Sequence, residues 1–134
     1  MPSSQRDAEA QRDPLTERII SAAIEVHRAL GPGLLESAYE ECLCHEFKLA
    51  DLRFERQVPL PVKYKNVQLD CAYRMDIVVE GRVVLEVKAV EALLAVHSAQ
   101  LLTYLKLAAL PTGLILNFAA PVMKNGIKRL SLTK

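Results

Sequence analysis

YRMDIVVEGRVVLEVKAV, residues 73–90, reads as two short apolar runs interrupted by single charges. The runs at 73–79 and 82–90 are rich in β-branched residues and meet near Glu80-Gly81, a pattern typical of two strands joined by a tight turn. Asp76, Glu86 and Lys88 stand inside these runs. Because a buried charge is costly without a partner, two carboxylates and an ammonium here indicate a functional site that holds a divalent cation.

The turn between the strands decides whether these charges meet. Glu86 and Lys88 share one face of their strand, roughly 6.6 Å apart, because side chains alternate along a strand. A two-residue loop would pair Asp76 with Leu85 and place the aspartate on the opposite face. A type I turn followed by a left-handed Gly81 makes a three-residue loop and places Asp76 on the face of Glu86. We therefore expect an odd-length loop or a bulge.

Helical and extended patterns flank the two strands. Asp13-Pro14 resembles a helix N-cap followed by proline, and the helix it begins is expected to end at Gly31-Pro32-Gly33. The remaining elements are expected to be a helix at 34–50, an extended edge segment at 54–62, a turn at 64–67 leading into 68–73, a helix at 96–109, and strands at 114–118 and 127–132. This order predicts an α/β fold, an α+β sandwich with a central mixed β-sheet flanked by helices.

Length and composition predict one domain. The chain has 134 residues and is 51% hydrophobic, which is enough for a single core over 14–134, with 1–13 as a flexible N-terminal leader. No apolar run reaches the ~18–20 residues that span a bilayer, and no secretory signal is evident. Cys42, Cys44 and Cys71 fit neither a disulfide framework nor a zinc site. Reduced thiols favour a cytoplasmic location, and the lack of a long apolar run predicts no membrane association.

Charge is distributed unevenly. The net charge is only +1, which argues against a dedicated nucleic-acid binder, but residues 1–50 carry nine acids and five bases while residues 51–134 carry seven acids and twelve bases. A basic half can form a local phosphate-binding surface. Solvated surface lysines would give the same pattern. The candidate phosphate contacts are Arg56, Lys63, Arg74 and Lys106.

The charged triplet predicts metal chemistry. Magnesium prefers hard oxygen ligands and usually keeps several waters, and Asp76, Glu86 and the Val87 carbonyl can supply such ligands. The metal would polarise a phosphate and acidify a water. Lys88 can position or deprotonate that water, or stabilise charge developing on the phosphate. The alternative is that Glu86 and Lys88 are solvent-side residues of a half-exposed strand, since Glu-x-Lys is common.

Three polar residues on helices extend the candidate site. Glu36 lies in the first turn of the second helix, where the helix dipole alone also explains a carboxylate. Gln100 and Tyr104 share a face of the later helix beside a leucine-rich stripe. Polar groups beside a buried stripe need partners, and the acidic site can provide them. Alternatively, Gln100 and Tyr104 simply border the core.

The sequence resembles the GxxExxY proteins, a group of small bacterial proteins within the PD-(D/E)xK nuclease superfamily. Gly33, Glu36 and Tyr39 match the motif that names the group, and the resemblance extends from about Leu15 to Leu130. Further matching segments lie at 23–27, 31–36, 55–60, 100–106, 117–118 and 126–129. The resemblance implies a restriction-endonuclease-like core of a helix, three strands, a helix and a final strand.

The resemblance also implies roles for individual residues. Asp76 would match the metal-binding aspartate of the superfamily, and Glu86-Val87-Lys88 its (D/E)xK element, while Glu36 would be presented by the second helix. Gln100 and Tyr104 would match the QxxxY element of the RecB-like and Cas4-like branches. Cas4-like nucleases also carry four cysteines for an iron–sulfur cluster. The three cysteines here do not reproduce that pattern, so we predict no cluster.

The leading hypothesis is a Mg²⁺- or Mn²⁺-dependent nuclease that hydrolyses phosphodiester bonds, with DNA the expected substrate and RNA the alternative. A second hypothesis is a non-catalytic module that retains the nuclease fold and binds nucleic acid or protein. A third is an interaction subunit, either a homodimer or one that takes its specificity from a partner protein. The predicted catalytic residues are Lys88, Asp76, Glu86, Glu36, Gln100 and Tyr104, and the predicted metal ligands are Asp76, Glu86, Val87 and Glu36.

Overall fold

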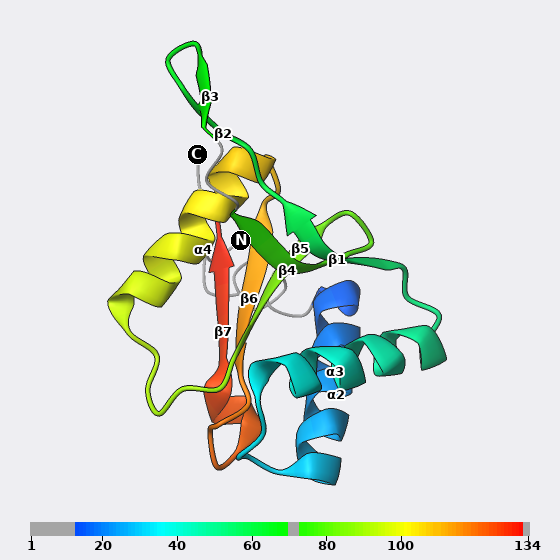
Figure 1. Cartoon of the computed structure of the whole chain (residues 1–134). Helices are drawn as coiled ribbons and strands as arrows, with labels where there is room; N and C mark the ends of the chain where they lie inside the picture. The colour runs from blue at the N-terminus through cyan, green and yellow to red at the C-terminus, as the bar shows by residue number, and fades with distance from the viewer. Residues whose placement is uncertain (1–12, 70–72, 133–134) are drawn as a thin grey trace, which may run out of the picture.

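A five-stranded mixed sheet forms the centre of the molecule in the computed structural model, which describes residues 13–69 and 73–132 (Figure 1). The strand order is β1-β4-β5-β6-β7, and only β5 and β6 run parallel to each other. Their connection passes through helix α4. The strands are β1 Phe54–Pro59, β4 Arg74–Val79, β5 Val83–Lys88, β6 Thr112–Asn117 and β7 Ile127–Ser131.

Helices cover both faces of this sheet. Helices α2 (Pro14–Leu30) and α3 (Glu36–Leu49) lie on one face and α4 (Ala95–Ala108) on the other (Figure 1). Alternate residues of one strand therefore enter two separate cores: Leu85 packs with α2 and α3, and Val84 packs with α4. The predicted α+β sandwich with a restriction-endonuclease-like core is confirmed.

The β4–β5 connection confirms the predicted register. Val79 pairs with Val83 and Ile77 with Leu85, so the loop has three residues and Asp76 falls opposite Glu86. The predicted type I turn is wrong. Both Glu80 (φ 54°) and Gly81 (φ 61°) have positive φ, which is the pattern of a type I′ turn.

Contacts with Arg53 explain why Glu80 accepts this conformation. The Glu80 carboxylate accepts hydrogen bonds from the backbone N–H of Arg53 at 2.6 Å and from its guanidinium at 3.1 Å. In addition, the backbone N–H of Glu80 donates to the Arg53 carbonyl at 2.8 Å. A short polar side chain is usual at such a position, and here these three bonds hold a glutamate instead.

Other boundaries differ only locally from the predictions. Helix α3 begins at Glu36 rather than Leu34, because the backbone of Leu35 is extended and serves as the N-cap. The extended edge segment ends at Pro59, and β1 is an edge strand, as its prolines indicated. The chain then forms a separate hairpin from β2 (Val62–Tyr64) and β3 (Val67–Leu69). A short 3₁₀ helix, Met123–Gly126, precedes β7.

The two ends of the first predicted helix are as expected. The Asp13 carboxylate accepts a hydrogen bond from the Thr16 backbone N–H at 3.1 Å and so caps α2. The remaining residues of the predicted leader, 1–12, lie outside the described residues, as does Cys71. Cys42 and Cys44 are free thiols. Across the described ranges, no helix combines the length and apolar character needed to cross a membrane.

Candidate metal centre

The candidate site begins where the β4–β5 ladder stops. Beyond the pair Ile77–Leu85, side chains replace the backbone hydrogen bonds between the two strands. The Asp76 backbone N–H donates to Glu86 Oε2 at 3.2 Å, and the Val87 backbone N–H donates to Asp76 Oδ2 at 2.8 Å. The two carboxylates predicted to meet therefore do meet, in the gap between β4 and β5.

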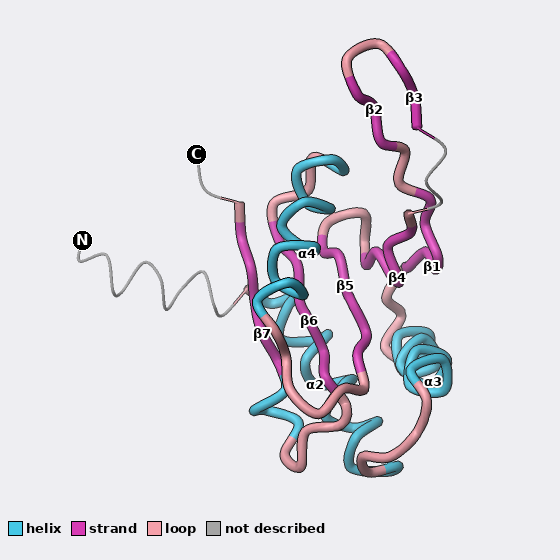
Figure 2. Tube along the Cα trace, turned by 60° about the vertical axis from the view of Figure 1, so that its left-hand side comes forward, coloured by secondary structure: helices cyan, strands magenta, loops and turns pink. Residues whose placement is uncertain are grey.

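Helix α3 lies alongside the free part of β5 (Figure 2). Glu36 Oε2 accepts a hydrogen bond from the Ala89 backbone N–H at 3.0 Å. Ala89 follows Val87, whose N–H binds Asp76, by two residues, so both N–H groups point to the same edge of the strand. The N–H and C=O of one strand residue point to the same edge. The Val87 carbonyl therefore lies on the strand edge that faces the carboxylates of Asp76 and Glu36, as a metal ligand at this position requires.

Tyr39 holds the loop that delivers Glu36. Its hydroxyl donates to the Gly31 carbonyl at 2.5 Å and accepts from the Leu34 backbone N–H at 3.1 Å. The ring is fully buried and stacks on Phe118 with 4.5 Å between centroids. Gly33 has φ +115°, which favours glycine there. The spacing of these three residues thus has a structural reason. Gly33 forms the turn, Glu36 is the acid at the site, and the Tyr39 side chain fixes the turn.

Tyr39→Phe tests this arrangement. The variant keeps the ring stack on Phe118 but leaves the Gly31 carbonyl and the Leu34 N–H without their partner. We expect a loss of about 1–2 kcal/mol in the free energy of unfolding, measured by urea denaturation. Tyr73→Phe is the matched control, because the ring of Tyr73 is about half exposed. Equal stability of Tyr39→Phe and wild type would show that the hydroxyl does not hold the loop.

Glu86 and Lys88 face α4 from β5, as their shared parity predicted. Burial, followed by the negative charge of Asp76, raises the pKa of Glu86 to about 8. Burial also raises the pKa of Asp76, and the Val87 N–H opposes that shift. The Lys88 ammonium lowers the pKa of both carboxyl groups. Buried Glu86 and half-buried Asp76 thus stand close together, and the charge of Lys88 acts on both.

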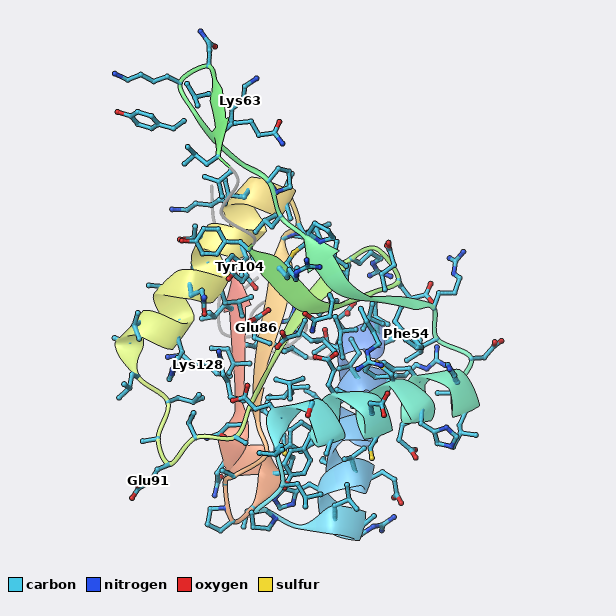
Figure 3. The ribbon with its side chains drawn as sticks, in the orientation of Figure 1. Phe54, Lys63, Glu86, Glu91, Tyr104 and Lys128 are labelled. Atoms are coloured by element: carbon cyan, nitrogen blue, oxygen red, sulfur yellow. The ribbon has the colours of Figure 1, made fainter. Side chains whose placement is uncertain are left out.

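Gln100 and Tyr104 meet on α4, on the side that covers these acids. Gln100 Nε2 donates to Tyr104 Oη at 2.9 Å. Tyr104 is buried, and its pKa is raised by burial and then by the charge of Glu86. Figure 3 shows Tyr104 above Glu86. The phenol therefore keeps its proton, and it can donate a hydrogen bond into the site.

Sequence reasoning missed Glu40. This acid is buried, one turn after Glu36, and its charge raises the pKa of both Asp76 and Glu86. Arg56 Nε and Nη2 donate to Glu40 Oε2 at 3.0 and 2.8 Å. The spacing of Glu36 and Glu40 at i and i+4 on one helix face was the available signal. Arg56, predicted as a phosphate contact, is thus paired with an acid.

Gln57 completes the surroundings of Glu40. Its Nε2 donates to Glu40 Oε1 at 3.0 Å, and its backbone has φ 51°. In the β1–β4 register, Arg56 pairs with Ile77 and Val58 with Met75. Gln57 therefore lies opposite Asp76, but these two residues do not form a strand pair. Positive φ at a non-glycine residue is costly and persists where neighbours hold it. The interruption of β1 therefore lies directly beside the gap.

A further residue, Asn117, supports the strand end that carries Lys88. Its Oδ1 accepts from the Val90 backbone N–H at 3.0 Å, and its Nδ2 donates to the Val90 carbonyl at 2.9 Å. Asn117 is buried at the end of β6. The amide therefore takes the place of a neighbouring strand for the residues that follow Lys88.

The oxygen atoms in the gap are of the kind that binds a hard divalent cation. Carboxylate and carbonyl oxygens from Asp76, Glu36, Glu86 and Val87 are the ligand type that Mg²⁺ and Mn²⁺ prefer. Among the residues that the structure describes, no three histidine, cysteine or acidic side chains form a ready-made metal cluster. Asp76 and Glu36 each bind a backbone N–H instead. To bind a metal, these carboxylates would have to release the backbone N–H groups.

The mixed sheet with an aspartate and a Glu-x-Lys triplet on adjacent strands defines a restriction-endonuclease-like fold. The chain belongs to the PD-(D/E)XK nuclease superfamily, whose family model matches residues 13–130. Comparisons with curated proteins and with solved structures gave no match. Because this superfamily consists mostly of nucleases, membership indicates a nuclease-type enzyme that acts on nucleic acid.

Proposed function

We propose that the protein is a metal-dependent nuclease that hydrolyses phosphodiester bonds in DNA. The observation that carries the proposal is the contact of Asp76 and Glu86 across the gap where the β4–β5 ladder stops, with the Lys88 charge acting on both carboxyl groups. Within the superfamily we assign the chain to the GxxExxY group and the RecB- and Cas4-like branch. The domain spans 14–134, acts in the cytoplasm and carries no iron–sulfur cluster.

Four residues would hold the metal. Asp76, Glu86, Glu36 and the Val87 carbonyl would supply the oxygen ligands, with Mg²⁺ or Mn²⁺ as the ion. When bound, the metal supplies Lewis acidity to a phosphate oxygen and lowers the pKa of a water. The site acids destabilise one another without a cation, since the charge of Asp76 raises the pKa of Glu86 and the charges of Glu40 and Glu36 raise the pKa of Asp76.

The protein side chains supply the remaining functions. The Lys88 ammonium, whose charge lowers the pKa of both carboxyl groups, would orient the attacking water or stabilise charge on the phosphate. The Tyr104 phenol, held by Gln100, would donate a hydrogen bond to the attacking water or the phosphate. Gln100 thus acts as a positioning residue for Tyr104.

Cleavage assays test the proposal directly. Supercoiled plasmid, linear duplex DNA and RNA are incubated with the purified protein in Mg²⁺, in Mn²⁺ and in EDTA. We expect DNA cleavage with either metal and none in EDTA. Absence of cleavage with both metals and all three substrates would contradict the proposal.

A second function is favoured by a specific observation. Asp76 and Glu36 each satisfy a backbone N–H of β5, so they also stabilise the free edge of the sheet without any catalysis. A non-catalytic module would use this fold and the basic C-terminal half to hold nucleic acid or a protein. Salt-sensitive DNA binding with no cleavage under any divalent ion would support that function.

A further inference from the structure

The β2–β3 hairpin extends away from the body of the protein (Figures 1 and 2). It forms its own two-stranded sheet, and nearly every residue in it is exposed. An isolated two-stranded hairpin is only marginally stable in water. Because the hairpin projects from the body without packing against it, contact with a binding partner would stabilise it.

The hairpin presents a basic tip and two different faces. Tyr64 pairs with Val67 across the strands, and these side chains are 61% and 59% exposed. Lys63 pairs with Gln68 on the opposite face. At the tip, Lys65 Nζ lies 5.4 Å from the centroid of the Tyr64 ring. Residues 62–69 contain two lysines and no acid, so the hairpin complements a polyanion.

The base of the hairpin is tied to the candidate site. The Leu60 N–H donates to the Tyr73 carbonyl at 2.8 Å, and Pro59 pairs with Arg74, two residues before Asp76. The Tyr73 ring packs edge-on against Tyr104, with 6.3 Å between centroids. In Figure 3, Lys63 lies on the hairpin beyond Tyr104 and Glu86. A nucleic acid that reaches the metal centre can therefore also reach the hairpin.

We propose that the β2–β3 hairpin is an arm that enters the major groove of duplex DNA while a phosphodiester lies at the metal centre. The proposal rests on the nuclease function and specifies double-stranded DNA as the substrate. A two-stranded ribbon fits the B-DNA major groove, which is about 12 Å wide and 8.5 Å deep. Strands of three residues reach about 10 Å. The major groove of A-form RNA is too narrow for such an element.

Each side chain has a role in this arrangement. Lys63 and Lys65 would contact phosphates at the groove edges, which supplies affinity without sequence information. Tyr64 and Val67 would lie against base edges and thymine methyl groups at the groove floor. A second copy of the arm is a poor occupant, because two arms with the same charge repel each other.

The first experiment removes the two charges. Binding of a short DNA duplex to Lys63→Gln/Lys65→Gln is measured by fluorescence anisotropy at several salt concentrations, in EDTA to prevent cleavage. Affinity should fall about tenfold, and the slope of log K against log salt should become less steep by about 1.8, or 0.9 per lost phosphate contact. The matched control, Lys48→Gln/Lys124→Gln, removes two other exposed lysines and should leave both quantities unchanged.

The second variant tests the groove contact itself. Tyr64→Ser/Val67→Ser should weaken duplex binding without changing the salt slope, because it removes no charge. Wild-type binding by both variants would overturn the proposal, as would an equal loss of affinity for an RNA duplex. It would also be overturned if the wild type were dimeric on a sizing column and the variants monomeric, since the arm would then bind a second copy.

A small substrate separates this proposal from the nuclease function. Bis-p-nitrophenyl phosphate cannot contact the arm, so the charge variant should hydrolyse it at the wild-type rate. Failure of the wild type to hydrolyse any substrate, combined with the expected loss of duplex binding in the variants, would overturn the nuclease function and leave the DNA-binding arm supported. Active wild type with unaltered duplex binding in both variants would overturn the arm alone.

Discussion

Replacing Lys88 with alanine is expected to reduce metal-dependent DNA cleavage by about a thousandfold, the range seen when a charge-stabilising or proton-transferring group is removed. The ammonium is the cation whose charge lowers the pKa of both Asp76 and Glu86. Without it, the attacking water and the charge developing on the phosphate lose this cationic side chain. Initial rates on linear duplex DNA in Mg²⁺ measure the effect.

Two companion variants make this result specific. Lys128→Ala removes an exposed lysine on β7 and should cleave at the wild-type rate. Asp76→Ala should lose cleavage to a similar extent and also lose Mn²⁺ binding in calorimetry, whereas Lys88→Ala should retain that binding. All variants should keep the circular dichroism spectrum of the wild type. Full activity in a folded Lys88→Ala or Asp76→Ala protein would refute the assigned site.

Glu86→Gln is expected to stabilise the metal-free protein at alkaline pH while abolishing cleavage. The pKa of Glu86 is raised from its ordinary value of 4.5 to about 8, first by burial and then by the charge of Asp76. Between these values the folded protein holds a proton that the unfolded chain has released. Stability should therefore fall as pH rises from 4.5 to 8, by an amount on the order of a few kcal/mol.

Thermal unfolding in EDTA at several pH values measures this effect. The wild type should lose stability relative to Glu86→Gln as pH rises, and the difference should level off below pH 4.5, where Glu86 is protonated in both states. Adding Mn²⁺ at pH 8 should stabilise the wild type but not the variant. Glu55→Gln, on the edge strand β1 and exposed, is the matched control. Parallel pH curves for wild type and Glu86→Gln would contradict the assigned cause.

The sequence predicted those features of the site that depend on the alternation of side chains along a strand and on the length of a short loop. Alternation along β5 correctly placed Glu86 and Lys88 on one face, and a three-residue loop was needed to bring Asp76 beside them. The exact turn type was not predictable, because Glu80 takes a positive φ only with Arg53 bonded to it. Arg53 is distant in sequence, and nothing near Glu80 indicates that contact.

The candidate site required tertiary packing to complete it. Glu40 is one of several acids on its helix, and only the position of α3 beside β5 and β1 shows that it is buried against Arg56. The bonds from Ala89 to Glu36 and from Val90 to Asn117 join residues 53 and 27 positions apart. Such contacts leave no periodic pattern in a single sequence. The resemblance to a known superfamily supplied the residue types but not these contacts.

The free edge of β5 also affects the tendency of the protein to aggregate. The N–H groups of Val87 and Ala89 form the beginning of an unpaired strand edge, which is a template for addition of a strand from another molecule. Asp76 and Glu36 occupy those donors and place negative charge in front of them. The acids assigned to metal binding are therefore also gatekeepers against intermolecular sheet growth, and replacing both by apolar residues would leave a surface prone to aggregate.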